Sequence, residues 1–114
     1  MAYDQKIAER VRAILAERGG VKEKPLMGSL AFMANGSMCC SVGRDNLLVR
    51  VDAAGRERLL GEPFVSPMKL GSRTMKGFVR VAPEGFRTRA RLAKWIELGI
   101  AAAPAVPRKR RNPR

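Results

Sequence analysis

The stretch Ser29–Val51 reads S-L-A-F-M-A-N-G-S-M-C-C-S-V-G-R-D-N-L-L-V-R-V and predicts the centre of the fold. It places Asn35-Gly36 between two apolar runs of β-compatible residues. A type I′ turn needs positive φ at both central residues, and Asn-Gly tolerates this conformation best. Gly43–Asn46 predicts a second turn and Leu47–Val51 a third strand. We therefore expect a three-stranded antiparallel meander.

A two-residue loop at Asn35-Gly36 also predicts the register of the hairpin. It pairs Ala34 with Ser37, Met33 with Met38, Phe32 with Cys39, and Ala31 with Cys40. Because side chains alternate along a strand, Met33, Met38, Cys40 and Val42 should share one face, and Leu30, Phe32 and Cys39 the other. Both faces are apolar, so we expect much of this hairpin to be buried on both sides.

The rest of the chain predicts helices that flank this meander. Asp4 and Thr88 are predicted N-caps of a first and a last helix, each with an apolar stripe. The expected order is α-β-β-β-α-β-β-α, an α+β fold in two layers with a five-stranded antiparallel sheet and three helices. The first helix should end at Gly19-Gly20 and the last before Pro104. Between these helices we also expect a connector at Val21–Gly28, a helix at Ala53–Leu60, a loop at Phe64–Pro67, strands at Met68–Leu70 and Met75–Val81, and a turn at Pro83–Gly85.

Length and composition indicate one small domain. The chain has 114 residues, 46% of them hydrophobic, which is enough to bury roughly two thirds of the unfolded surface. We expect a domain over residues 1–103. Residues 104–114 combine proline with Arg108, Lys109, Arg110 and Arg111 and hold too little apolar surface to fold, so they predict a disordered basic tail.

The residues offer little for catalysis. The chain contains no histidine, the side chain best suited to proton transfer near neutral pH. No close acidic pair suggests a metal site or an acid/base dyad, and we expect no cofactor. Cys39 and Cys40 are expected to be small buried hydrophobes in a reduced compartment. The alternative is a thiolate beside Arg44 or Arg50. We therefore expect that the protein is not an enzyme.

The formal charge of +13 favours polyanionic partners. If the strands Leu47–Val51 and Met75–Val81 present their basic faces to the same side, Arg50, Lys76 and Arg80 form a basic patch beside Phe78, able to contact phosphates and stack on a base. An ordinary solvated face is the alternative interpretation. The residues Arg108, Lys109, Arg110 and Arg111 either bind nucleic acid through counterion release or only make the protein soluble.

Location and self-association are also open to prediction. The first ten residues lack the apolar segment of a signal peptide, and no apolar run approaches the ~20 residues that span a membrane. We expect a cytoplasmic protein without membrane contact. A homodimer could form through a sheet edge and the face of Met33 and Met38.

Four motifs resemble the TfoX (Sxy) N-terminal domain family across residues 1–100. They are the opening M-A-Y-D, the run G-S-L-A-F-M-A-N-G-S-M-C-C at Gly28–Cys40, the strand L-L-V-R-V, and P-M-K followed by M-K-G-F-V-R-V. The resemblance implies a two-layer sandwich of the kind compared with secretion-chaperone domains. It also implies a link to positive regulation of natural competence, together with the cyclic-AMP receptor protein. It supplies no catalytic residues.

These observations lead to two principal hypotheses. The first is a non-enzymatic binding module that acts in transcriptional regulation through protein contacts, with Met33 and Met38 in the contact surface. The second is a nonspecific nucleic-acid-binding protein that uses Arg50, Lys76, Phe78, Arg80 and the tail. A third and weaker hypothesis is a thiol-dependent activity at Cys39 or Cys40.

Overall fold

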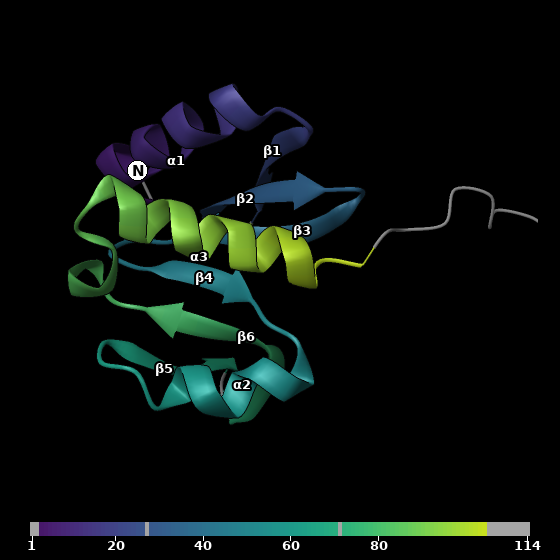
Figure 1. The fold of residues 1–114 in the computed structure, drawn as a ribbon, viewed down its shortest axis with the longest axis vertical. Helices are drawn as coiled ribbons and strands as arrows, with labels where there is room; N and C mark the ends of the chain where they lie inside the picture. The colour runs from purple at the N-terminus through teal and green to yellow at the C-terminus, as the bar shows by residue number, and fades with distance from the viewer. Residues whose placement is uncertain (1–2, 27, 71, 105–114) are drawn as a thin grey trace, which may run out of the picture.

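The computed structural model describes residues 3–26, 28–70 and 72–104. In this part of the chain, three α-helices lie on one side of a six-stranded antiparallel sheet with the strand order β1-β2-β3-β4-β6-β5 (Figure 1). The α+β fold with three helices is therefore confirmed. The elements are α1 (Gln5–Arg18), β1 (Val21–Leu26), β2 (Ser29–Ala34), β3 (Ser37–Val42), β4 (Leu47–Arg50), α2 (Ala53–Leu60), β5 (Val65–Leu70), β6 (Arg73–Val81), a short 3₁₀ helix (Pro83–Phe86) and α3 (Arg89–Ala102).

The helices begin where their capping residues predict. Asp4 Oδ1 accepts a hydrogen bond from the Ile7 amide at 3.0 Å, and Thr88 Oγ1 accepts one from the Arg91 amide at 3.1 Å. Such side chains satisfy amides that the first turn of a helix leaves without a partner. Gly19 ends α1 with a φ of 77°, a conformation that glycine adopts without steric cost.

The predicted number of strands was wrong, because Val21–Leu26 is a strand and not a connector. This segment pairs antiparallel with β2 along its whole length, from Val21 opposite Ala34 to Leu26 opposite Ser29. Pro25 is compatible with this strand, because β1 lies at the edge of the sheet and a proline is tolerated there. Strand β5 also begins earlier than predicted, at Val65, and the predicted turn at Pro83 is a 3₁₀ helix.

The hairpin turn has the predicted conformation, with φ of 56° at Asn35 and 85° at Gly36. The predicted register holds only for the two pairs next to the turn. Beyond them a β-bulge inserts Cys39, so that Phe32 lies opposite Cys40 and Leu30 opposite Val42. A single sequence pattern did not reveal the bulge, since both faces of the hairpin are apolar.

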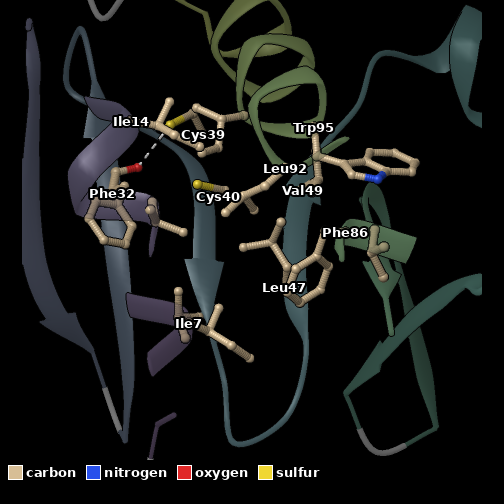
Figure 2. Packing of buried hydrophobic residues seen from close by; sticks show 14 of the residues in the cluster. Ile7, Ile14, Phe32, Cys39, Cys40, Leu47, Val49, Phe86, Leu92 and Trp95 are labelled. Atoms are coloured by element: carbon tan, nitrogen blue, oxygen red, sulfur yellow. Dashed lines mark hydrogen bonds between the residues drawn. The ribbon is translucent and has the colours of Figure 1, made fainter. Parts of the chain in front are cut away.

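The bulge changes which side chains share a face. Phe32, Cys40 and Val42 lie together on the side of the helices, so the predicted grouping of Cys40 and Val42 with the methionines was wrong. Cys39 and Cys40 both belong to the buried core beneath the helices, instead of pointing to opposite faces (Figure 2). Cys39 Sγ donates a hydrogen bond to the Phe32 carbonyl at 3.3 Å.

Helix α3 lies over the middle of the sheet, where it contacts β3 and β4 (Figure 1). Trp95 at its centre is 6% exposed, and its Nε1–H donates to the Gly85 carbonyl at 3.0 Å. Arg10 of α1 donates to the Phe86 carbonyl at 2.6 Å. These bonds join α1, the 3₁₀ helix and α3 into one layer. The opposite face of the sheet is left without a helix in the described part of the chain.

Candidate functional site

The side of the sheet turned away from the helices forms a continuous surface that we call the outer face. Its membership follows from strand pairing, because directly opposed residues point to the same side of a sheet. Val49 and Val79 are opposed and lie in the core, so the neighbouring pairs Leu48–Arg80 and Arg50–Phe78 point outward. The outer face consists of Lys22 and Lys24 on β1, Ala31 and Met33 on β2, Met38 and Ser41 on β3, Leu48 and Arg50 on β4, Phe78 and Arg80 on β6, and Ser66 and Met68 on β5.

The middle of the outer face is apolar and only partly covered. Met33, Met38, Leu48, Met68 and Phe78 are all half-buried, although no described helix covers them. Methionine side chains are flexible and polarisable, and they adapt to irregular partners. An apolar surface that crosses several strands and is bordered by polar side chains is typical of a contact site.

Arg50 is fixed across this face by two contacts. The pairing of β3 with β4 runs from Val42 to Cys40 and stops at the bulge. Beyond it, the Met38 carbonyl accepts a hydrogen bond from Arg50 Nε at 2.6 Å. The guanidinium carbon lies 4.8 Å from the centre of the Phe78 ring, within the range of a cation–π interaction. The bulge therefore acts on both sides of the sheet. It places Cys39 in the core on the helix side, and it ends the β3–β4 pairing next to the contact of Arg50 with Met38 on the outer face.

The charges of the outer face have one sign. Lys22, Lys24, Arg50 and Arg80 are its charged residues, and all are basic. The strands contain one acidic residue, Glu23, which points to the helix side and forms an ion pair with Arg12 of α1 at 2.6 Å. Within the described strands, the positive charge of the outer face is therefore not neutralised by a carboxylate on the same surface.

The predicted basic patch is present in part. Phe78 and Arg80 lie on one face, as the alternation predicted, and the pairing of β4 with β6 adds Arg50 to them. A role of these residues in nucleic-acid binding stays a prediction. Lys76 is exposed, but the β5–β6 register shifts between Pro67 and Lys69, so alternation does not place Lys76 on the outer face. The predicted contact residues Arg108, Lys109, Arg110 and Arg111 lie outside the described residues.

The structure joins two surfaces that the sequence analysis treated separately. Met33 and Met38 are opposed on β2 and β3, on the same face as Arg50. Lys22 and Lys24 were missed, because their segment was interpreted as a connector. Lys22, Glu23 and Lys24 are three consecutive charged residues, so the segment lacks the alternation of apolar and polar residues that signals a strand.

The cysteines lie on the other side of the sheet and are fully buried. Interaction with the adjacent Cys39 thiol and burial both raise the pKa of the Cys40 thiol well above its usual range. A protonated, inaccessible thiol is a poor nucleophile. Among the described residues, no group of three or more Cys, Asp or Glu side chains could hold a metal ion.

A hollow of about 240 Å³ lies between α2 and α3. Trp95 and Leu59 form its apolar wall, while Arg91, Lys94 and Glu62 are at its polar rim. The indole nitrogen already donates to the Gly85 carbonyl. The charged residues at its rim are exposed and of both signs, whereas those of the outer face are all basic. The hollow therefore favours no partner of one charge.

The chain matches a described protein family over most of its length. Residues 13–103 match the family described as TfoX N-terminal domain, which is most of the chain. No curated protein matches the chain at significance. The described helices include none that is long and apolar enough to cross a membrane.

Proposed function

The chain belongs to the TfoX N-terminal domain family, and we propose that it is a non-enzymatic binding module of transcriptional regulation that acts through protein contacts. The observation that supports this proposal most strongly is the outer face, with its apolar middle and its uncompensated positive charge. An apolar surface bordered by charged side chains is typical of a protein–protein contact site, because a complementary partner removes its apolar area from water. The proposed regulatory role, including a place among competence regulators, derives from the family resemblance.

The chemistry of the described side chains supports a non-enzymatic role. The chain has no histidine, and its two thiols are buried beneath the helices. The functional groups of the outer face are guanidinium and ammonium groups, two serine hydroxyls and thioethers. These groups bind anions and apolar side chains, but they include no general base suited to neutral pH.

A nonspecific nucleic-acid-binding protein is the second candidate function. The four cations of the outer face and the Arg-rich tail favour it, since each neutralised phosphate releases counterions. The aromatic content of the face argues against it. Phe78 is the single aromatic residue among the outer-face positions, and Arg50 lies over its ring. Single-strand binders commonly stack several bases on aromatic side chains.

The experiment that tests the first function uses the native host. The full chain is tagged at its gene and purified under mild conditions, and co-purifying proteins are identified by mass spectrometry. Transcripts are compared between the parent strain and a deletion strain. We expect a reproducible protein partner and a defined set of changed transcripts. Recovery of the chain without a partner, together with unchanged transcripts, would contradict the proposal.

The second candidate is tested separately with DNA and RNA of mixed sequence in a salt series. Nonspecific binding predicts affinity that falls steeply between 50 and 200 mM salt, by about 10³-fold or more if six or more phosphates are contacted. Removing residues 105–114 and changing Arg50 and Arg80 to Ala should then weaken binding. Affinity that is independent of salt and of these residues would exclude this candidate.

Three further expectations remain proposals. We propose that the protein is cytoplasmic, which fractionation of host cells would test. We also propose that its two-layer sandwich is similar to secretion-chaperone domains, which a comparison of strand order with such domains would test. The third expectation is a homodimer, which would compete with a partner protein for the face of Met33 and Met38; sedimentation of the purified chain at several concentrations measures it.

A further inference from the structure

We propose that the outer face binds an acidic amphipathic helix of a partner protein. This inference rests on the proposed function, because it names the surface and the chemistry of the protein contact. The apolar residues of the face supply the contact area, and the surrounding cations select the charge of the partner. Three observations define the occupant: the charge of the face, the state of the sheet edges, and the length of the apolar strip.

The charge of the face selects an acidic partner. Lys22, Lys24, Arg50 and Arg80 point to this side, and the described strands place no carboxylate beside them. Arg50 is held in position by the Met38 carbonyl, so its guanidinium loses little additional freedom on binding. A planar guanidinium binds a carboxylate through two parallel hydrogen bonds. Glutamate or aspartate side chains at the rim of a partner helix fit this arrangement.

The sheet edges disfavour a partner that adds a strand. Strand β1 is one edge of the sheet and contains Pro25, while β5 is the other edge and contains Pro67. Proline lacks the amide needed for a ladder hydrogen bond, and lysines on an edge strand also discourage pairing. Docking on the face is therefore favoured over extension of the sheet. A helix meets this requirement, since its own backbone hydrogen bonds are already complete.

The apolar strip has the length of a short helix. Its residues lie on consecutive strands of the sheet: Met33 on β2, Met38 on β3, Leu48 on β4, Phe78 on β6 and Met68 on β5. Four spacings of about 4.8 Å separate β2 from β5, which gives a strip of about 19 Å. At a rise of 1.5 Å per residue, this corresponds to about 13 residues, or between three and four helical turns.

Other occupants fit the charges and the side chains less well. A second copy of the chain, placed face to face, would bring the same four cations opposite one another. The tail of the chain is itself rich in arginine, so it repels the face instead of neutralising it. Nucleic acid would place phosphates over methionine and leucine side chains, and Phe78 already has Arg50 over its ring. Each of these occupants is an outcome of the test below.

The test uses defined probes with the full chain. The first probe is an 18-residue peptide with Leu at helical i, i+3, i+4 and i+7 positions and Glu at most others. The second has Lys in place of each Glu, the third has the Glu and Leu order scrambled, and the fourth is a 20-nucleotide oligothymidylate. Binding is measured by fluorescence anisotropy. Contacts are mapped from amide shifts in nuclear magnetic resonance spectra.

We expect the acidic helical peptide to bind, with shifts concentrated in β2, β3, β4 and β6. The scrambled peptide should bind with an affinity lower by roughly tenfold or more, and the Lys peptide should not bind. The proposal is overturned if the scrambled peptide binds equally well, if the shifts map to α1–α3, or if oligothymidylate binds more tightly than the acidic peptide. Concentration-dependent self-association in sedimentation that Leu48→Glu abolishes would overturn it as well.

Variants distinguish the outer face from general electrostatic attraction. Arg80→Glu reverses one exposed cation of the outer face, and Lys94→Glu makes the matched charge change on α3, on the helix side. We expect Arg80→Glu to weaken peptide binding by roughly tenfold and Lys94→Glu to leave it nearly unchanged. Leu48→Glu, with its folding verified by circular dichroism, should also abolish binding. Equal losses in Arg80→Glu and Lys94→Glu would overturn the proposal.

Crosslinking in the native host separates failure of this inference from failure of the proposed function. A photoreactive residue is placed at position 48 on the outer face or at position 94 on α3. We expect position 48 to crosslink a partner segment that is acidic and has helical apolar periodicity. Crosslinking through position 94 alone would overturn the inference and leave the proposed function standing. No crosslinked partner at either position, with unchanged transcripts after deletion, would contradict both.

Discussion

Gly99 of α3 packs directly on the main chain of Cys39 in β3, where a β-carbon at residue 99 would overlap the Cys39 carbonyl oxygen. The same β-carbon would lie 3.5 Å from a methyl group of Val49. The helix can therefore approach the bulged strand only because residue 99 has no side chain. Through this approach α3 packs on β3 and β4, on the side of the sheet opposite the outer face.

We expect Gly99→Ala to lower the free energy of unfolding by about 1–3 kcal/mol. Alanine favours helix over glycine by about 1 kcal/mol, but the clash is with backbone atoms, which cannot move aside as a flexible side chain can. Urea denaturation followed by circular dichroism measures the change. Gly77→Ala is the control, because no heavy atom lies within 4 Å of its β-carbon position. A Gly99→Ala protein as stable as the control would contradict the packing described here.

The second prediction concerns the contact between Arg50 and Met38. We expect Arg50→Ala to cost about 1–3 kcal/mol, since it removes a charged hydrogen bond and leaves a partly buried carbonyl with a weaker partner. Arg50→Lys should recover part of the loss, because it restores a cation near the Phe78 ring. The comparison is the midpoint of urea unfolding at an unchanged slope.

Arg80→Ala is the matched control for this substitution. Arg80 is exposed, and its described contact is a long one, 3.8 Å from its Nη2 to the Met68 sulfur. Surface changes of this kind usually stay within about 0.5 kcal/mol. Equal losses for Arg50→Ala and Arg80→Ala would mean that the hydrogen bond to Met38 has no special stabilising effect.

Much of the fold could be predicted from local signals. The caps at Asp4 and Thr88 and the turn at Asn35-Gly36 each depend on a side chain or a dihedral angle of that residue alone. The strand at Val21–Leu26 could not be recognised in the same way. Its proline is compatible with a strand only at a sheet edge, and the sequence does not state which strand lies at the edge.

The candidate site was predictable only in fragments. Alternation along β6 predicted that Phe78 and Arg80 share a face, and the pairing of β4 with β6 in the structure adds Arg50 to them. The position of Met38 beside Arg50 depends on the bulge at Cys39, which is a property of the paired strands. Where both faces of a hairpin are apolar, the hydrophobic pattern does not fix register, and the outer face could not be assembled before the structure was known.

The third prediction concerns the ion pair between Arg12 and Glu23, which joins α1 to the edge strand β1. The hydrogen bond from Arg12 lowers the pKa of the Glu23 carboxyl, while burial opposes this shift. Because the folded pKa lies below the unfolded one, the pair stabilises the protein above a pH of about 4.3, and this contribution is lost as pH falls through the folded pKa. Both side chains are about 40% exposed, at 39% and 42%, so water and salt screen the pair.

We therefore expect Glu23→Gln to cost about 0.2–1 kcal/mol at pH 7 and close to nothing at pH 2.5. Urea unfolding at the two pH values measures the difference, and 1 M salt should reduce it at pH 7. Glu17→Gln is the comparison variant, because its pair with Arg89 is more exposed, at 73% for Glu17 and 57% for Arg89. A loss for Glu23→Gln that is the same at both pH values would show that charge is not the cause.

The last prediction concerns the two thiols and tests the hypothesis of a thiol-dependent activity. Cys39 and Cys40 are fully buried beneath the helices, and the pKa of Cys40 is raised by the neighbouring thiol and by burial. At any pH from 7 to 9 the folded protein should therefore contain less Cys40 thiolate than the unfolded chain. We expect iodoacetamide to alkylate the native protein on the order of a thousandfold more slowly than the chain in 8 M urea, because reaction must await opening of the core. Mass spectrometry at successive times gives the rate for each cysteine, and Gly99→Ala should accelerate both rates in proportion to its loss of stability. Rapid alkylation of either cysteine in the native state at pH 7 would instead show an accessible thiolate, and it would restore the thiol as a candidate for chemistry in this fold.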